Sequence, residues 1–68
     1  MYRNLKAELV RHNIATSEIA KRLGITPGTA SLKINGKATI TLKEAFLIQN
    51  LIYEKSDIKI TIEELFKV

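Results

Sequence analysis

Apolar residues recur every three or four positions along most of this chain, the spacing that places them on one face of an α-helix. Leu5 and Leu9 lie one turn apart in the first such segment, which contains no glycine or proline. Ile19, Ala20 and Leu23 share a face in the second. The pattern predicts an all-α fold, a compact bundle of five short helices in one domain over residues 1–68, with helices at 4–11, 16–23, 27–35, 41–53 and 61–66.

Residues with special backbone or capping properties mark the expected helix ends. Gly24 and Gly36 follow the second and third helices, where glycine adopts a left-handed conformation without steric cost. Thr26 can cap the third helix while Pro27 takes its first position. Thr-x-x-Glu capping boxes start the fourth and fifth helices. Between those two helices, residues 55–60 contain an alternating Ile-Lys-Ile run that could instead form a short extended strand.

Composition excludes several classes of protein. The 68 residues include no cysteine, so disulfides and thiolate metal sites are excluded, and one histidine cannot hold zinc alone. No apolar run approaches the ~20 residues that span a bilayer, and the N-terminal residues lack the pattern of a signal peptide. No glycine-rich phosphate loop is present. We expect a cytoplasmic domain that is not an enzyme and holds no cofactor or metal.

Charge is unevenly placed along the chain. Eight basic and two acidic residues give residues 1–43 a net charge of +6, whereas residues 44–68 carry −2. The sequence pI is about 9.6. A basic half suits an anionic partner such as nucleic acid, although an ordinary solvated surface can have the same charge distribution.

Residues 16–35 combine a helix, a glycine-centred turn and a second helix, the layout of a helix-turn-helix. Ala20 is small where the two helices would cross, and Ala30 and Ile34 share the inward face of the second helix. The outward face then carries Gly28, Ser31, Leu32 and Asn35, with Thr29 and Lys33 on its flanks. Such a helix is expected to lie in a DNA major groove, and an ordinary helical hairpin is the simpler alternative.

The run IAKRLGITPGTASLKINGK, residues 19–37, resembles the helix-turn-helix of lambda-repressor-like proteins, which include phage repressors and Cro-type regulators. The N-terminal helix, TLKEAFLIQNLI and TIEELF resemble the remaining helices of short Gram-positive phage and prophage repressors, so the similarity covers nearly the whole chain. The resemblance implies a five-helix domain that binds operator double-stranded DNA sequence-specifically and regulates transcription. It also implies a homodimer on a palindromic site.

The resemblance further implies which residues contact DNA. Phosphate contacts come from the start of the second helix, the loop after the third and the start of the fourth, here Thr16, Ser17, Asn35, Lys37, Thr39, Thr41 and Lys43. Base contacts come from the start and exposed middle of the third helix, here Pro27, Gly28, Ser31 and Leu32. Our predicted interface adds Thr26 at the start of that helix. Four lysines are expected to neutralise phosphate charge: Lys21, Lys33, Lys37 and Lys43. Hydrogen bonds to bases are expected from Thr29, Ser31 or Lys33.

The chain departs from the family pattern in three places. Ala30 stands where the family usually has a larger aliphatic residue, which leaves less core volume. Ala15 stands where serine or threonine often caps the second helix, so Thr16 is expected to act as the cap. Pro27, Gly28 and Leu32 stand where polar residues are common, and none offers a side-chain hydrogen bond to a base. This apolar face keeps a second hypothesis open, a protein–protein adaptor whose third helix docks a partner protein instead of DNA.

The predicted fourth helix is more apolar than one buried face requires. An inward stripe is expected to contain Leu42, Ala45, Ile48 and Ile52. The extra apolar residues either widen the core stripe or form a subunit contact. The contact predicted for a homodimer consists of Leu47, Leu51, Ile58 and Ile60.

Overall fold

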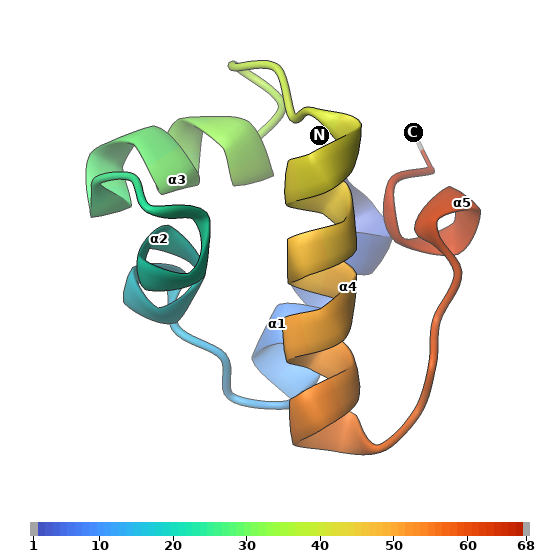
Figure 1. The fold of residues 1–68 in the computed structure, drawn as a ribbon. Coiled ribbons are helices and arrows are strands. Elements are labelled where there is room, and N and C mark those ends of the chain that lie inside the picture. Colours follow the sequence, from blue (N-terminus) through green and yellow to red (C-terminus); the bar gives the residue numbers. More distant parts are fainter. Residues whose placement is uncertain (1, 68) are drawn as a thin grey trace.

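A computed structural model describes residues 2–67, which fold into five α-helices and contain no strand (Figure 1). The all-α class expected from the sequence is therefore confirmed. Within this part of the chain, no helix has the length and apolar character needed to cross a membrane. The helices are α1 (Arg3–Arg11), α2 (Thr16–Leu23), α3 (Pro27–Ile34), α4 (Leu42–Ser56) and α5 (Ile62–Leu65).

Left-handed residues end the first three helices. Asn13, Gly24 and Gly36 have φ angles of 56°, 72° and 76°, which confirms the two predicted glycine stops. After each of these residues, the next amide donates to a carbonyl five residues earlier, the bond that defines a Schellman motif. These bonds join Ile14 to Leu9 at 2.8 Å, Ile25 to Ala20 at 3.0 Å and Lys37 to Leu32 at 2.9 Å.

Threonines begin the last three helices. Thr26 caps α3, and Thr41 forms the full capping box with Glu44 through bonds of 3.2 and 3.0 Å. Thr61 accepts the Glu64 amide at 3.1 Å, but the structure shows no return bond from the Thr61 amide to the Glu64 carboxylate. The second predicted box is therefore only half formed.

One expectation about local structure is wrong, and one alternative left open by the sequence is settled. Ala15, and not Thr16, is the N-cap of α2, and its amide donates to the Glu18 carboxylate at 3.4 Å. The segment considered as a possible strand forms none, because α4 continues to Ser56 and ends at Asp57, which is left-handed with φ 60°. The Ser56 hydroxyl accepts the amide two residues later, which folds the chain back at once.

One face of each helix contributes to a single apolar core. Ala30 and Ile34 of α3 are buried in it, as the helical wheel predicts. Three residues of the expected stripe of α4 are buried, namely Ala45, Ile48 and Ile52. Leu42, also expected there, is 64% exposed, whereas Leu51, which was not, is only 3% exposed. The buried face is wider than expected because α4 packs against both α2 and α5. The core consists of Leu5, Leu9, Ile14, Ile19, Ala20, Ala30, Ile34, Ile48, Leu51, Ile52 and Leu65.

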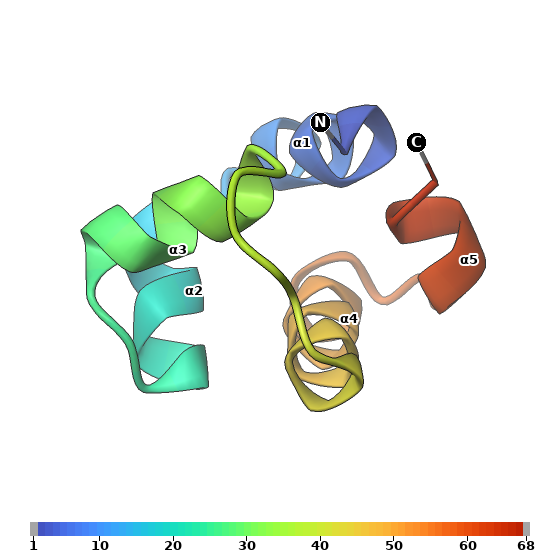
Figure 2. The ribbon, with the colours of Figure 1, turned by 90° about the horizontal axis from the view of Figure 1, so that it is seen from above.

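The helices surround α4, which stands at the centre of the view in Figure 1. The pair α2 and α3 lies on one side of α4, α5 lies on the other, and α1 lies behind it; the view from above in Figure 2 agrees. The chain passes from α3 to α4 through a loop at the top of the molecule. This arrangement puts α3 at the edge of the fold, with one face free of other helices.

Candidate nucleic-acid interface

The α2–α3 pair is a packed unit with an open outer face. Ile19 and Ala20 of α2 and Ala30 of α3 are buried in the core, and α3 runs across α2 (Figure 2). On the opposite side of α3, Gly28 and Ser31 are exposed to solvent. The predicted inward face is thus confirmed, and so are Gly28, Ser31 and Leu32 of the outward face, whereas Asn35 is half-buried.

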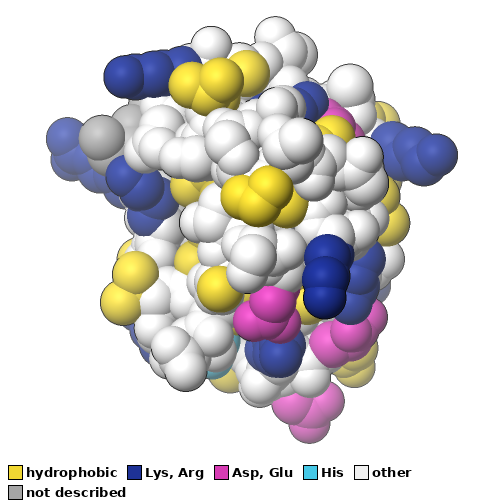
Figure 3. Space-filling model, turned by 90° about the vertical axis from the view of Figure 1, so that its left-hand side faces the viewer, with side chains coloured by type: hydrophobic (Ala, Val, Ile, Leu, Met, Phe, Trp, Pro, Cys, Tyr) yellow, Lys and Arg dark blue, Asp and Glu magenta, His cyan; other side chains and the backbone are white. Residues whose placement is uncertain are grey.

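Figure 3 shows the side of the molecule formed by α2 and α3. Uncharged polar side chains and backbone fill most of its centre, and separate hydrophobic groups lie among them. Leu32, with 48% of its surface exposed, is the large hydrophobic residue that α3 presents to solvent. Lysine and arginine side chains lie in separate groups, several towards the margin and others beside acidic side chains in the lower half of the view. A surface of this kind lets a partner approach α3 closely while cations stand around the contact.

Lys33 does not belong to this face, contrary to its predicted base contact. Its Nζ donates to the two carboxylate oxygens of Glu44 at 2.8 and 3.0 Å and to the Thr39 carbonyl at 3.0 Å. An ammonium has three hydrogens, so these acceptors use all of them and none remains for a base. The Lys33 and Glu44 side chains are only 15% and 16% exposed. The side chain therefore turns towards the start of α4 and joins it to α3.

The Lys33–Glu44 contact is an ion pair with the Nζ–Oε1 distance at 2.8 Å. The hydrogen bonds from Lys33, followed by the bond from the Thr41 amide, hold the pKa of the Glu44 carboxyl below its ordinary value. The carboxylate thus stays ionised at neutral pH while it serves both the capping box of α4 and the link to α3.

Polar side chains along α3 are partly occupied by one another. The Asn35 side-chain amide donates to the Ser31 carbonyl at 2.8 Å and to the Ser31 hydroxyl oxygen at 3.3 Å. Thr26 and Thr29 are joined through their hydroxyls at 3.0 Å. The Ser31 hydroxyl hydrogen and the Asn35 carbonyl oxygen have no partner within residues 2–67, so they remain available for hydrogen bonds with a ligand.

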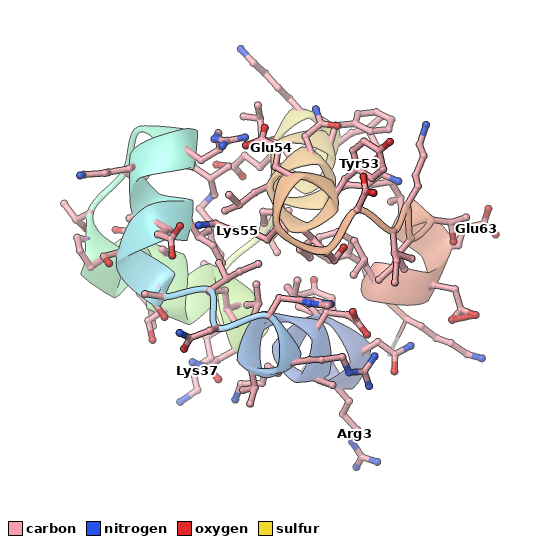
Figure 4. The ribbon with its side chains drawn as sticks, turned by 90° about the horizontal axis from the view of Figure 1, so that it is seen from below. Arg3, Lys37, Tyr53, Glu54, Lys55 and Glu63 are labelled. Carbon is pink, nitrogen blue, oxygen red and sulfur yellow. The ribbon has the colours of Figure 1, made fainter. Side chains whose placement is uncertain are left out.

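Three lysines around this face are exposed and form no ion pair with any residue that the structure describes. They are Lys21 on α2, Lys37 in the loop after α3 and Lys43 in the first turn of α4. The Lys37 side chain extends away from the body of the molecule in Figure 4. These side chains can neutralise an anionic partner without breaking an existing contact.

Other cations near α2 are already paired. Arg22 donates to both oxygens of Glu54 at 3.0 and 2.8 Å, and Lys55 lies 3.0 Å from Glu18. These hydrogen bonds are the main reason why the pKa values of the Glu18 and Glu54 carboxyls are lowered. Glu54 and Lys55 lie where α4 faces α2 in Figure 4. The two pairs therefore join α2 to the end of α4.

The residues predicted to contact phosphates lie at the surface, at the start of α2 and around the α3–α4 loop. Asn35 is the partial exception, because it is half-buried. The first turn of α2 has no side-chain cap, because Ala15 offers no acceptor. The exposed members of the predicted set are Thr16, Ser17, Lys37, Thr39, Thr41 and Lys43.

Only some residues of the predicted subunit contact have surface exposed to a second subunit. Leu51 is buried within its own chain, which leaves almost no surface for a second subunit, so its predicted role there is wrong. Leu47 and Ile60 are half-buried, and Ile58 is 59% exposed. The strongly exposed apolar side chains of α4 are Leu42, Phe46 and Tyr53.

Comparison of the chain with protein-family models, with curated proteins and with solved structures gave no match. The resemblance to lambda-repressor-like proteins therefore rests on the quoted residues alone. The shape, charge and hydrogen bonds of the α2–α3 face are the features that bear on function.

Proposed function

We propose that the protein is a transcriptional regulator that binds operator double-stranded DNA, with α3 in the major groove. The observation that carries this proposal is the outer face of α3, which is exposed and has a glycine and a serine where bulky side chains would hold a partner away. Lys21, Lys37 and Lys43, which are exposed and form no ion pair within residues 2–67, lie on the elements next to it. Together these features suit close contact with an anionic duplex.

Leu32 is the residue best placed to recognise a base. Its side chain is 48% exposed, and it lies one turn beyond Gly28 on the same helix face. The thymine methyl is the one apolar group that a base pair presents in the major groove. We expect Leu32 to contact such a methyl while Ser31 and Asn35 offer the remaining hydrogen bonds.

The surrounding residues would hold the DNA backbone. The uncapped first turn of α2 presents the amides of Thr16 and Ser17, and backbone amides at a helix start favour phosphate. Lys21, Lys37 and Lys43 add positive charge around α3. These contacts are expected to set orientation and overall affinity, without distinguishing between sequences.

A homodimer belongs to the same proposal. One such domain covers few base pairs, and two related by a two-fold axis would place their α3 helices about 34 Å apart, one turn of DNA. Of the residues first predicted for the contact, Ile58 offers the most exposed surface. Occupation of an operator that overlaps a promoter would then block transcription sterically.

Selection of bound duplexes from a random DNA pool tests the proposal. The wild-type protein should enrich a site with two-fold symmetry and a thymine at one fixed position of each half. Leu32→Ala should enrich sites without that thymine preference. A pool that stays random after repeated rounds, with no retention of any duplex at low salt, would contradict DNA binding.

The adaptor hypothesis keeps one observation in its favour. Pro27, Gly28 and Leu32 give the start and middle of α3 an exposed surface without side-chain hydrogen-bonding groups. A protein partner could cover this surface. Retention of random duplex by the wild-type protein at low salt separates the two functions, because an adaptor of this kind would not retain it.

A further inference from the structure

The Lys33 side chain spans the gap between α3 and the first turn of α4. Its ammonium reaches Glu44 at 2.8 and 3.0 Å and also the Thr39 carbonyl at 3.0 Å. One cation therefore holds three parts of the chain: the last turn of α3, the middle of the connecting loop and the start of α4. The contact is protected from water, since both charged side chains are about five-sixths buried.

The loop held in this way carries predicted phosphate contacts. Lys37, Thr39 and Thr41 are exposed on it, and Lys43 follows in the first turn of α4. The Lys37 and Ala38 amides both donate to the Leu32 carbonyl, at 2.9 and 3.2 Å, so the first half of the loop is fixed to α3. The bond from Lys33 to Thr39 fixes the second half. The loop thus has a defined shape before any ligand arrives.

We propose that Lys33 is a positioning residue, which together with Glu44 presets the α3–α4 loop for the DNA backbone and does not itself contact DNA. This inference rests on the proposed DNA-binding function. Binding to a loop that is already ordered avoids the entropy loss of ordering it in the complex. Loss of the pair should therefore weaken binding to every sequence alike.

The decisive variant removes the pair without changing net charge. Lys33→Met with Glu44→Gln deletes one positive and one negative charge, and glutamine still suits the third position of a capping box. We expect about a tenfold loss of affinity, equivalent to about 1.4 kcal/mol, on any duplex. The slope of log affinity against log salt should stay as in the wild type, because that slope counts neutralised phosphates.

Lys21→Met is the matched control. Lys21 is exposed and forms no ion pair with the described residues, so its loss should make the salt slope less steep by about 0.9. Amide hydrogen exchange at Lys37 and Ala38 should speed up in the double variant and stay unchanged in Lys21→Met. Lys33→Arg keeps the charge and can still pair with Glu44, so it should bind within about threefold of wild type.

All variants are compared at a temperature where circular dichroism shows them folded. If the double variant does not fold, the same hydrogen-exchange and salt-dependence measurements are made on Lys33→Met alone. A salt slope reduced by about 0.9 in the double variant would show that Lys33 touches phosphate and would overturn the inference. Unchanged affinity in a variant shown to lack the pair would overturn it as well. A wild-type protein that retains no duplex contradicts the proposed function itself, which distinguishes that failure from failure of the positioning role.

Discussion

Substitution of Gly28 by alanine should separate stability from DNA binding. Gly28 lies in the second position of α3, and a Cβ added there would meet no other atom within 4 Å. Its backbone is helical, a conformation in which alanine is favoured over glycine by about 0.5–1 kcal/mol. We expect Gly28→Ala to raise the free energy of unfolding by about that amount. For a domain of this size the melting temperature should rise by roughly 2–8 °C.

The same methyl group should weaken DNA binding. It would stand on the outer face of α3, between the helix backbone and the groove that the proposal places against it. Displacement of the helix from the bases should lower affinity for a selected site by about tenfold, or 1.4 kcal/mol. Fluorescence anisotropy with a labelled duplex measures this loss, and urea unfolding followed by circular dichroism measures the stability.

Gly24→Ala is the control for backbone effects. Its added Cβ would also meet nothing within 4 Å, but Gly24 has a φ of +72°. Alanine in this left-handed conformation costs about 1–2 kcal/mol, so the free energy of unfolding should fall. DNA affinity of the folded protein should hardly change. Wild-type affinity in Gly28→Ala would refute the close approach of α3 to DNA, whereas reduced stability in that variant would refute its helical conformation.

Three further perturbations test other parts of the account. Uracil lacks only the methyl group of thymine, so replacing the contacted thymine by uracil should cost the wild type about 0.5–1 kcal/mol of binding free energy and Leu32→Ala almost nothing. Equal costs in both proteins would show that Leu32 does not contact the methyl. Because the pKa of Glu44 is lowered, its carboxylate stabilises the fold at pH values above the ordinary pKa of 4.5, and this contribution is lost as pH falls through the folded-state pKa. The free energy of unfolding, measured from pH 6 to 3, should therefore depend less on pH in Glu44→Gln than in the wild type. Identical pH profiles would argue against the Lys33–Glu44 pair. Leu51→Glu should unfold the domain, because Leu51 is 3% exposed and a buried carboxylate would have no partner; a folded protein would contradict the core packing. Ile58 is 59% exposed, so Ile58→Glu should change the free energy of unfolding by less than about 0.5 kcal/mol and should shift any dimer towards monomer in sedimentation.

Local signals in the sequence predicted the helices well. Gly24, Gly36 and the threonine caps act within a few residues of their own positions, so their effect is readable without the fold. The helical wheel of α3 likewise gave the correct inward face, because Ala30 and Ile34 are its buried residues.

The wrong predictions concern side chains whose burial or partner is set by a distant part of the chain. Lys33 pairs with Glu44 across the α3–α4 loop, a contact that has no helical spacing to reveal it. Leu51 is buried because α2 packs against that side of α4. Leu42 was expected inside on periodicity alone, yet it lies in the first turn of α4 and stays exposed. Each of these outcomes depends on tertiary packing.

The salt dependence of binding to double-stranded DNA is the sharpest test of whether this protein binds DNA through its exposed lysines. Four lysines were expected from sequence to neutralise phosphates, and the pairing of Lys33 with Glu44 leaves three: Lys21, Lys37 and Lys43. Three neutralised phosphates correspond to a log–log slope of about −2.7 for each bound subunit. Anisotropy titrations of wild-type protein on one duplex between about 50 and 200 mM salt should give this value. A slope near zero, or no binding at the lowest salt, would contradict the account.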